Sequence, residues 1–494
     1  MPRIITFVLC CLLLASLYGG EINHNQSSIP FSIVSRSQSE MNIQFSLPEH
    51  HLETKRDQGI TWQRILMDQG IYQADAGVPD LPVLSFSIAI PVQGSVQVDL
   101  LRSSTRVVSD FIPYPSQDGL RNNDNQTFRI NESYYQGRSN FPERVIDHSP
   151  PMVMRDLRII TVQVSPFIWD PGTRQLTIHD DMDIRVHFTS NPGENELSQS
   201  PTLISSLWAK QYEAMVLNFD DYRDVVIANT PPRYLVVHGN YVNTSFSEAI
   251  DSFVFWKKQK GADVDVVSTA LTGTQNTQIK SYIQNQYNNP ATRPDFIIFI
   301  GDTGGSFPIQ TWSVSSGAGD YPYTHLAGTD GLGDCFIGRI SANDNTQLMN
   351  LFNKIYLYEK NINLTSAAWL NRMLLVGDWS PSGISTVNIS KYIKETALDI
   401  NPNYTFTELY GSQPSASEMN NGINQGVAFF NYRGYINMSD WSPSESNLYN
   451  GSKTPHGVFI TCATGNFDGT STTESFLRLG STASPKGGVT AIGM

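Results

Sequence analysis

The chain has 494 residues, of which 40% are hydrophobic, 16% charged and 11% aromatic. This length predicts two to four domains, and this composition is that of a globular rather than a disordered protein. A formal net charge of −13, without any block of basic residues, argues against a nucleic-acid-binding protein.

Residues 1–20 are typical of a secretory signal peptide. Arg3 is followed by an apolar run over residues 4–17 and then by small residues. This run is too short for a comfortable membrane span, and no other stretch is long and apolar enough to cross a bilayer. We therefore expect a secreted or cell-surface protein without a transmembrane anchor.

Two cysteines remain once the signal peptide is removed. Cys10 and Cys11 leave with it, whereas Cys335 and Cys462 stay in the mature chain. An extracytoplasmic compartment permits a disulfide between them, and two separate thiols are equally compatible with the sequence.

The sequence predicts no zinc site, because it contains neither a Cys-x-x-Cys pair nor a His-Glu-x-x-His motif. The acidic pairs Asp180-Asp181 and Asp220-Asp221 could hold Ca²⁺ as a structural ion, since carboxylate oxygens suit it. Without a spaced ligand loop, solvated surface charge is the preferred interpretation of both pairs. We expect that no cofactor is required.

Residues 21–190 are typical of a mostly antiparallel β-domain. Short alternating runs recur there, broken by Gly, Pro and Asp, with no helical periodicity between them. A polar linker with a helical segment at residues 203–219 follows over residues 191–232. The Asn-Thr-Pro-Pro run that ends it marks the clearest domain boundary in the chain.

From residue 233 onward, strands alternate with helices, which predicts an α/β fold with parallel sheets. Residues 233–365 form the first subdomain, in which apolar strands are expected at 233–238 and 296–300. Residues 366–494 form the second, with its last strands at 458–461 and 489–492. Because the chain stops directly after a strand, we expect this second subdomain to be truncated.

Cys462 is the candidate nucleophile. It follows the strand at residues 458–461, and chemistry in open α/β sheets gathers at the carboxyl ends of strands. A buried structural cysteine is the alternative, since free cysteines are often buried. A cysteine nucleophile needs a base, usually a histidine. Among the nine histidines, His238 is the best candidate for this base, because it ends the first strand of the α/β part at the edge where Cys462 would emerge. The preferred interpretation of His238 is nevertheless a histidine in a surface loop.

Several sequence blocks resemble the gingipain-like cysteine peptidases, which have a caspase-like fold. The β-rich region before residue 190 is similar to the propeptide of that family. The resemblance spans roughly residues 55–494. The blocks are FITCATGNFD at 459–468, GVAFFNYRGY at 426–435 followed by Trp441, DCFIGRI at 334–340 followed by Tyr358-Glu359, FIGD at 299–302, and, in the propeptide-like region, GVPDLPV at 77–83.

The resemblance implies a secreted cysteine endopeptidase made as a zymogen, acting on proteins or peptides and partnered by its own propeptide. Cys462 would be the nucleophile, and the backbone N–H groups of Gly434 and Cys462 would bind the oxyanion. Asp302 could orient the base and Asp320 could select a basic substrate residue. A turn-capping role for Asp302 and a loop role for Asp320 are the simpler interpretations. Trp441 is a further candidate for substrate binding.

One position departs from the family pattern. The family places its catalytic histidine in an Asn-Tyr-x-Gly-His-Gly stretch, and residues 431–436 read NYRGYI, so that Tyr435 stands in place of the histidine. A phenol is a poor base at neutral pH because its reference pKa is about 10. Losing general-base help typically costs about 10²–10⁴-fold in rate. The alternative function is therefore an inactive pseudo-peptidase that serves as a secreted binding or scaffold protein.

Overall fold

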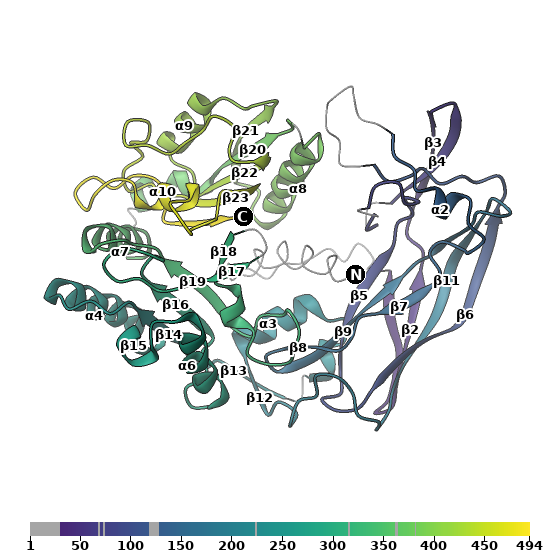
Figure 1. Ribbon diagram of the computed structural model, residues 1–494, viewed down its shortest axis with the longest axis horizontal. Coiled ribbons are helices and arrows are strands. Elements are labelled where there is room, and N and C mark those ends of the chain that lie inside the picture. Colours follow the sequence, from purple (N-terminus) through teal and green to yellow (C-terminus); the bar gives the residue numbers. More distant parts are fainter. Residues whose placement is uncertain are drawn as a thin grey trace. The chain divides into compact units, whose positions relative to one another are not determined.

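The computed structural model describes residues 30–67, 70–72, 75–117, 128–222, 225–314, 317–360, 364–380 and 382–494. The predicted signal peptide lies outside the described residues. The chain divides into two compact units (Figure 1). Among the described residues, unit 1 comprises those up to Thr230 together with Ala327–Asp334. Unit 2 comprises Pro231–Leu326 and Cys335–Met494.

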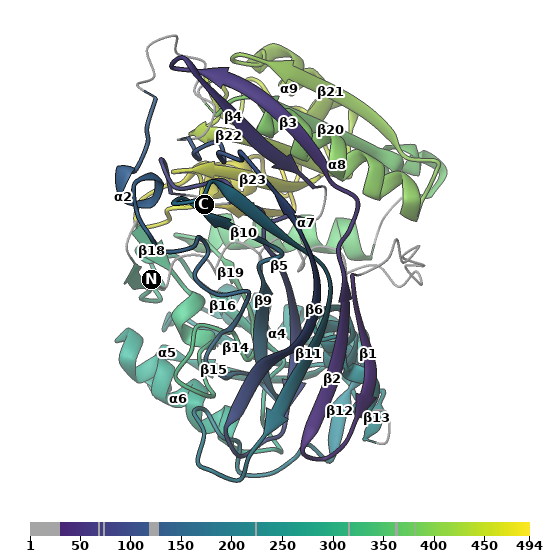
Figure 2. The ribbon, with the colours of Figure 1, turned by 90° about the vertical axis from the view of Figure 1, so that its right-hand side faces the viewer.

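Unit 1 is built mainly from antiparallel strands, as predicted. One sheet has the order β1-β2-β11-β10, with β6 also paired to β11, and another has the order β5-β9-β7, with β8 on β9. Figure 2 shows β3 and β4 as a further hairpin. The strands are β1 Phe31–Arg36, β2 Glu40–Ser46, β3 His51–Asp57, β4 Ile60–Leu66, β5 Leu84–Ile90, β6 Val96–Val108, β7 Ile146–His148, β8 Met152–Met154, β9 Leu157–Val164, β10 Phe167–Asp170 and β11 Gln175–Phe188.

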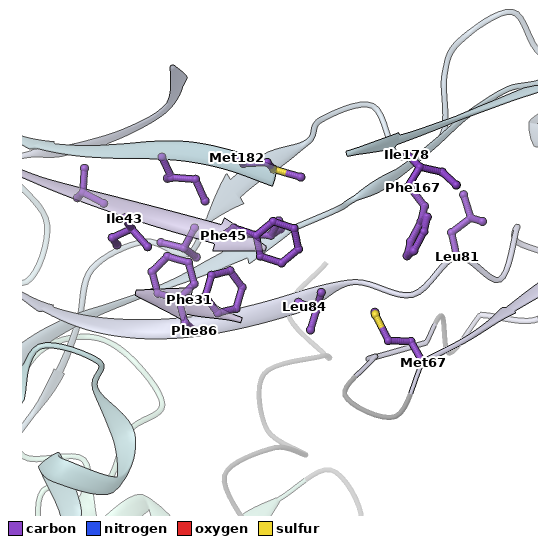
Figure 3. Close-up of a cluster of buried hydrophobic side chains, with 14 of the residues drawn as sticks. Phe31, Ile43, Phe45, Met67, Leu81, Leu84, Phe86, Phe167, Ile178 and Met182 are labelled. Atoms are coloured by element: carbon purple, nitrogen blue, oxygen red, sulfur yellow. The ribbon is translucent and has the colours of Figure 1, made fainter. Parts of the chain in front are cut away.

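The core of unit 1 lies between its two larger sheets. Strand β2 alternates buried and more exposed residues, with Met41, Ile43 and Phe45 facing inward, as a half-buried strand should. Figure 3 shows Phe31 of one sheet beside Phe86 of the other, and their ring centroids are 4.5 Å apart. Alternating apolar residues on the two sheets thus supply one shared core.

The segment before residue 232 differs from the single helix expected at residues 203–219. Residues Leu203–Ser205 form strand β12, which pairs in parallel with β13 (Val226–Ala228). Helix α3 covers Ser206–Met215, because the Ser205 hydroxyl accepts the Trp208 N–H and caps its start. A 3₁₀ turn, η1, follows at Phe219–Tyr222.

Unit 2 contains two parallel sheets flanked by helices, which confirms the predicted fold class. Their orders are β15-β14-β16-β19 and β21-β20-β22-β23-β24. The strands are β14 Arg233–His238, β15 Asp263–Ser268, β16 Phe296–Ile300, β19 Phe336–Ile340, β20 Arg372–Asp378, β21 Thr405–Gly411, β22 Phe429–Ile436, β23 His456–Cys462 and β24 Thr490–Gly493. The longer helices are α4 Thr244–Gln259, α6 Asn276–Asn288, α7 Asn345–Glu359, α8 Ser385–Ile400, α9 Ala416–Gln425 and α10 Thr472–Arg478.

An aromatic cluster packs against the second sheet of unit 2. The ring centroids of Phe430 and Phe459, on neighbouring strands, are 5.2 Å apart, and Phe476 of α10 joins them. Trp441 is 4% exposed in this cluster, and its indole N–H donates to Asn420 at 2.9 Å. Trp441 is therefore a packing residue of this cluster, and substrate binding by Trp441 stays a prediction.

In the part of the chain that the structure describes, no helix combines the length and apolar character that crossing a bilayer requires.

Candidate active site

Cys462 ends strand β23, and its side chain is exposed. It is not joined to Cys335, which is buried and donates its thiol hydrogen to the Pro294 carbonyl at 3.1 Å. The disulfide that the sequence allowed is therefore not formed, nor is Cys462 the buried structural cysteine of the alternative interpretation. An accessible thiol stands at the carboxyl edge of a parallel sheet.

The register of β22 and β23 pairs Ile436 with Cys462, one residue after Tyr435. Arg433 pairs with Ile460 and Ile436 pairs with Cys462, so β22 carries one extra residue over this interval. Gly434 and Tyr435 form the resulting bulge, and bulges re-aim side chains near functional sites. The tyrosine side chain is 45% exposed. Tyr435 thus immediately precedes the residue paired with Cys462.

Gly434 is required by the space around it. A Cβ at this position would lie 2.8 Å from a ring carbon of Tyr432, a contact too short for carbon atoms. The Tyr432 ring cannot move aside easily because its hydroxyl donates to Asp378 at 3.0 Å. Packing alone therefore accounts for a glycine at position 434.

The backbone around Cys462 is held tightly. The Cys462 carbonyl accepts the Asn437 N–H at 2.8 Å, and Thr464 donates from its hydroxyl to the Thr461 carbonyl at 2.9 Å. Ala463, directly after the thiol, has φ of +66°, a left-handed conformation that is unfavourable for residues with a Cβ. Such strain persists only where surrounding contacts impose it, and it clusters at functional sites.

Asp378, which the sequence interpretation did not single out, supports the loop that follows Tyr435. It ends β20, is 4% exposed, and accepts hydrogen bonds from the hydroxyls of Tyr432 and Ser439. Burial, with help from this carboxylate, raises the pKa of Tyr432. The sequence did contain a signal for Asp378. A Gly-Asp pair follows an apolar run at residues 377–378, and the same pattern occurs at residues 301–302.

Asp302 forms an ion pair with Arg478. Its carboxylate accepts the Thr303 N–H at 2.7 Å and lies 2.7 Å from the Arg478 guanidinium of α10. Arg478 also pairs with Glu474 at 2.8 Å, and burial raises the pKa of that glutamate. The hydrogen bond from the Thr303 N–H corresponds to the turn-capping role that the sequence analysis gave as the simpler interpretation of Asp302. Orientation of a base by Asp302 stays a prediction.

Asp320 is likewise engaged inside unit 2. Arg339 donates to both of its carboxylate oxygens, at 2.7 Å and 2.8 Å, and the guanidinium lies over the ring of Phe467. Phe467 belongs to the loop that follows Cys462. Asp320 therefore supports that loop through Arg339, and selection of a basic substrate residue by Asp320 stays a prediction.

The histidines are less well placed than strand order suggested. His238 ends β14, which belongs to the other sheet of unit 2, and its Nδ1 lies 2.9 Å from the Gly239 carbonyl oxygen. His456 begins β23, at the opposite end of the strand from Cys462, and burial lowers its pKa to about 4. A base role for His238 stays a prediction that the sheet order does not favour.

The two acidic pairs that were weighed as Ca²⁺ ligands against solvated surface charge make local contacts. Asp180 pairs with Arg106, Asp181 accepts from the Ser46 hydroxyl, and Asp221 pairs with Arg36. Within the described ranges, no group of three or more His, Cys, Asp or Glu residues is arranged to hold a metal ion.

Comparison with protein families matches two models to this chain. The model described as "Peptidase family C25" covers residues 227–494, and the model described as "Propeptide_C25" covers residues 27–226.

Two curated relatives are gingipains of Porphyromonas gingivalis. Gingipain R2 is 22% identical over 481 residues, covering 94% of this chain and 64% of the relative. Lys-gingipain HG66 is 26% identical over 502 residues, covering 95% of this chain and 28% of the relative. The chain therefore spans less than two thirds of the length of the curated relatives that it matches.

Two solved structures resemble parts of the chain. The crystal structure of the Arg-specific cysteine proteinase gingipain R has a TM-score of 0.46 at 21% identity, covering 54% of this chain and 62% of that one. The complex of P. gingivalis RgpB pro- and mature domains has a TM-score of 0.36 at 22% identity, covering 39% and 98%.

Proposed function

Because this chain belongs to peptidase family C25 and carries the matching propeptide region, we propose that it is the precursor of a secreted, gingipain-like cysteine endopeptidase. Cys462 is the proposed nucleophile. The observation that carries this assignment is the register of β22 and β23, which places an exposed thiol beside the Gly434–Tyr435 bulge.

In the proposed reaction, the Cys462 thiolate attacks the carbonyl carbon of a peptide bond. The backbone N–H groups of Gly434 and Cys462 bind the oxyanion that develops. The leaving amine takes a proton from the Tyr435 phenol or from water, and a water molecule then releases the acyl group from sulfur. Since Tyr435 is a weak base, the thiol loses its proton to solvent. We therefore propose that activity rises toward alkaline pH.

The propeptide region is proposed to keep the precursor latent until processing. Support comes from the match of residues 27–226 to the propeptide model of this family. Processing is proposed within residues 222–233. The candidate cleavage site after Arg223 lies outside the described residues.

The test is alkylation of Cys462 by iodoacetamide, followed against pH beside hydrolysis of casein by the processed protein. We expect casein hydrolysis to rise with the same pH profile as alkylation. The Cys462→Ala variant should lose both signals, since Cys335 is buried. Efficient alkylation of Cys462 without casein hydrolysis at any pH would overturn the endopeptidase proposal.

A pseudo-peptidase that binds protein or peptide segments is the second candidate, and the observation that favours it is Tyr435. The substitution Tyr435→His, combined with Ile436→Gly, restores the family pattern at both positions. Casein hydrolysis that appears only in this variant, and disappears when Cys462→Ala is added, would identify the natural chain as the inactive form. Equal hydrolysis by both forms would exclude it.

A further inference from the structure

Arg433 lies where the pairing between strands β22 and β23 is interrupted. It pairs with Ile460, and the next pair along the strands joins Ile436 to Cys462. The Gly434–Tyr435 bulge lies between these two pairs. Partners in a parallel pair project to the same side of the sheet, and residues two apart along a strand share a face. The half-buried Arg433 side chain therefore projects from the face that carries Cys462.

The Arg433 guanidinium joins the two strands at this bulge. Its Nη1 donates to the Ile460 carbonyl at 2.9 Å and also to the Gly434 carbonyl. A bulge leaves one residue without a partner and locally disrupts the ladder of backbone hydrogen bonds. Arg433 thus supplies a side-chain donor where backbone pairing is interrupted, and hydrogen bonds from a charged donor are stronger than those between neutral groups.

The hydrogen bond to the Gly434 carbonyl fixes the peptide unit between Gly434 and Tyr435. A peptide unit is planar and trans, so its carbonyl and its N–H point in opposite directions. Holding the Gly434 carbonyl toward Arg433 therefore sets the direction of the Tyr435 N–H and the point from which the Tyr435 side chain departs. Because glycine rotates more freely than other residues, this peptide unit gains most from a contact that holds it.

The bulge is also held at its far end. The Asn437 N–H donates to the Cys462 carbonyl at 2.8 Å, which restores contact between the two chain segments just after Ile436. Contacts at Ile460 and at Cys462 thus hold both ends of the bulge, and the Arg433 guanidinium holds the backbone between them. Together these contacts restrict rotation of the backbone at residue 434.

We propose that Arg433 is a positioning residue for the reaction at Cys462. Its guanidinium locks the Gly434–Tyr435 peptide. Through this lock it orients the Gly434 N–H that binds the oxyanion and the Tyr435 phenol that protonates the leaving amine. The proposal rests on the proposed function, which assigns those two roles. Arg433 occupies the unspecified third position of the Asn-Tyr-x-Gly-His-Gly stretch, so the family pattern does not assign it this role.

The activity test compares Arg433→Met with the wild type in hydrolysis of labelled casein by the processed protein. Methionine keeps an unbranched side chain and removes the donors. We expect kcat to fall about tenfold or more and KM to change by less than about threefold, because an oxyanion donor acts mainly in the transition state. Arg433→Lys should recover part of kcat, since an ammonium group has donors for both carbonyls. An unchanged kcat in Arg433→Met would overturn the positioning role.

Amide hydrogen exchange with mass spectrometry gives a second measurement that does not depend on turnover. Residues 434–437 should exchange about fivefold faster in Arg433→Met, because loss of this contact eases local opening of the bulge. Faster exchange combined with no casein hydrolysis by the wild type would support the lock and overturn the peptidase proposal. Unchanged exchange would overturn the lock, whatever the activity of the wild type.

Arg372→Met is the matched control. Arg372 is exposed at the start of β20 in the same sheet, and it also donates to a backbone carbonyl, that of Gln425, at 3.2 Å. It lies at the opposite edge of the sheet from Cys462, so its loss should leave both kcat and the exchange of residues 434–437 unchanged. Equal effects of both substitutions would overturn a specific role for Arg433. Thermal melting reports folding, and Arg433→Gln carries the test if Arg433→Met does not fold.

Discussion

The guanidinium of Arg339 holds both carboxylate oxygens of Asp320, at 2.7 Å and 2.8 Å, in a nearly buried pair. Removing one partner of such a pair leaves the other charge buried and uncompensated, which costs about 3–5 kcal/mol. We therefore expect Asp320→Ala to lower the free energy of unfolding by about this amount. Urea unfolding measures it, with the exposed Asp251→Ala as control. An unchanged unfolding curve, with binding of basic peptides lost, would instead support a substrate role for Asp320.

The second prediction concerns Asp378 and the loop that follows Tyr435. The Asp378 carboxylate accepts the Ser439 hydroxyl, and both Asn437 and Ser439 have positive φ, so the loop needs outside support. We expect Asp378→Ala to speed amide hydrogen exchange over residues 435–440 and to destabilise the protein by about 1–3 kcal/mol. Hydrogen exchange with mass spectrometry checks this, with the exposed Asp399→Ala as control. Unchanged exchange in this loop would show that Asp378 does not support it.

The parallel sheets were predictable because buried parallel strands carry continuous apolar runs. Leu235–Val237 is such a run and is fully enclosed in β14. The same pattern located Cys462, because a short apolar strand ends directly before it. Strand patterns follow from local sequence, which is why the fold class and the position of a cysteine at a strand end could be inferred together, whereas the exposure of that cysteine came from the structure.

The pairing of polar side chains could not be predicted in the same way. Asp302 and Arg478 are 176 residues apart, and only the packing of α10 near the end of β16 brings them together. The His238 prediction had a related weakness. His238 ends β14 in one sheet and Cys462 ends β23 in the other, and the order of the strands does not show which side chains of two sheets come together.

The third prediction concerns Lys354, which is 1% exposed on α7 and donates to the carbonyls of Leu477 and Lys486. Burial lowers its pKa from 10.5 to about 7. Between pH 7 and 10.5, the unfolded chain binds more protons than the folded protein does. The contribution of Lys354 to the free energy of unfolding therefore rises with pH across this range.

Urea unfolding at several pH values from 7 to 10 checks this. The stability of the wild type relative to Lys354→Met should increase over that range, and Lys354→Met should cost about 1–3 kcal/mol at pH 10 because two buried carbonyls lose their donor. Lys258→Met, on the exposed face of α4, is the control. A stability difference that does not change with pH would contradict the lowered pKa.

The fourth prediction concerns His456, whose ring packs against Tyr358 and Phe429, with Nδ1 2.7 Å from the Thr490 hydroxyl oxygen. Burial lowers its pKa from 6.5 to about 4. The unfolded chain therefore takes up this proton at a higher pH than the folded protein does. The contribution of neutral His456 to the free energy of unfolding is fully present above pH 6.5 and is lost as the pH falls toward 4. This contribution is at most about 3 kcal/mol.

His456→Gln removes this titration, so the stability of the wild type relative to this variant should fall between pH 6.5 and 4. His51→Gln, at an exposed histidine of β3, is the control. Urea unfolding across this range measures the change, and the ring-proton resonances of His456 should not titrate above pH 5. A folded-state titration near pH 6.5 would contradict the prediction. Since His456 stays neutral above pH 5, any change in Cys462 reactivity between pH 6 and 9 must come from other groups.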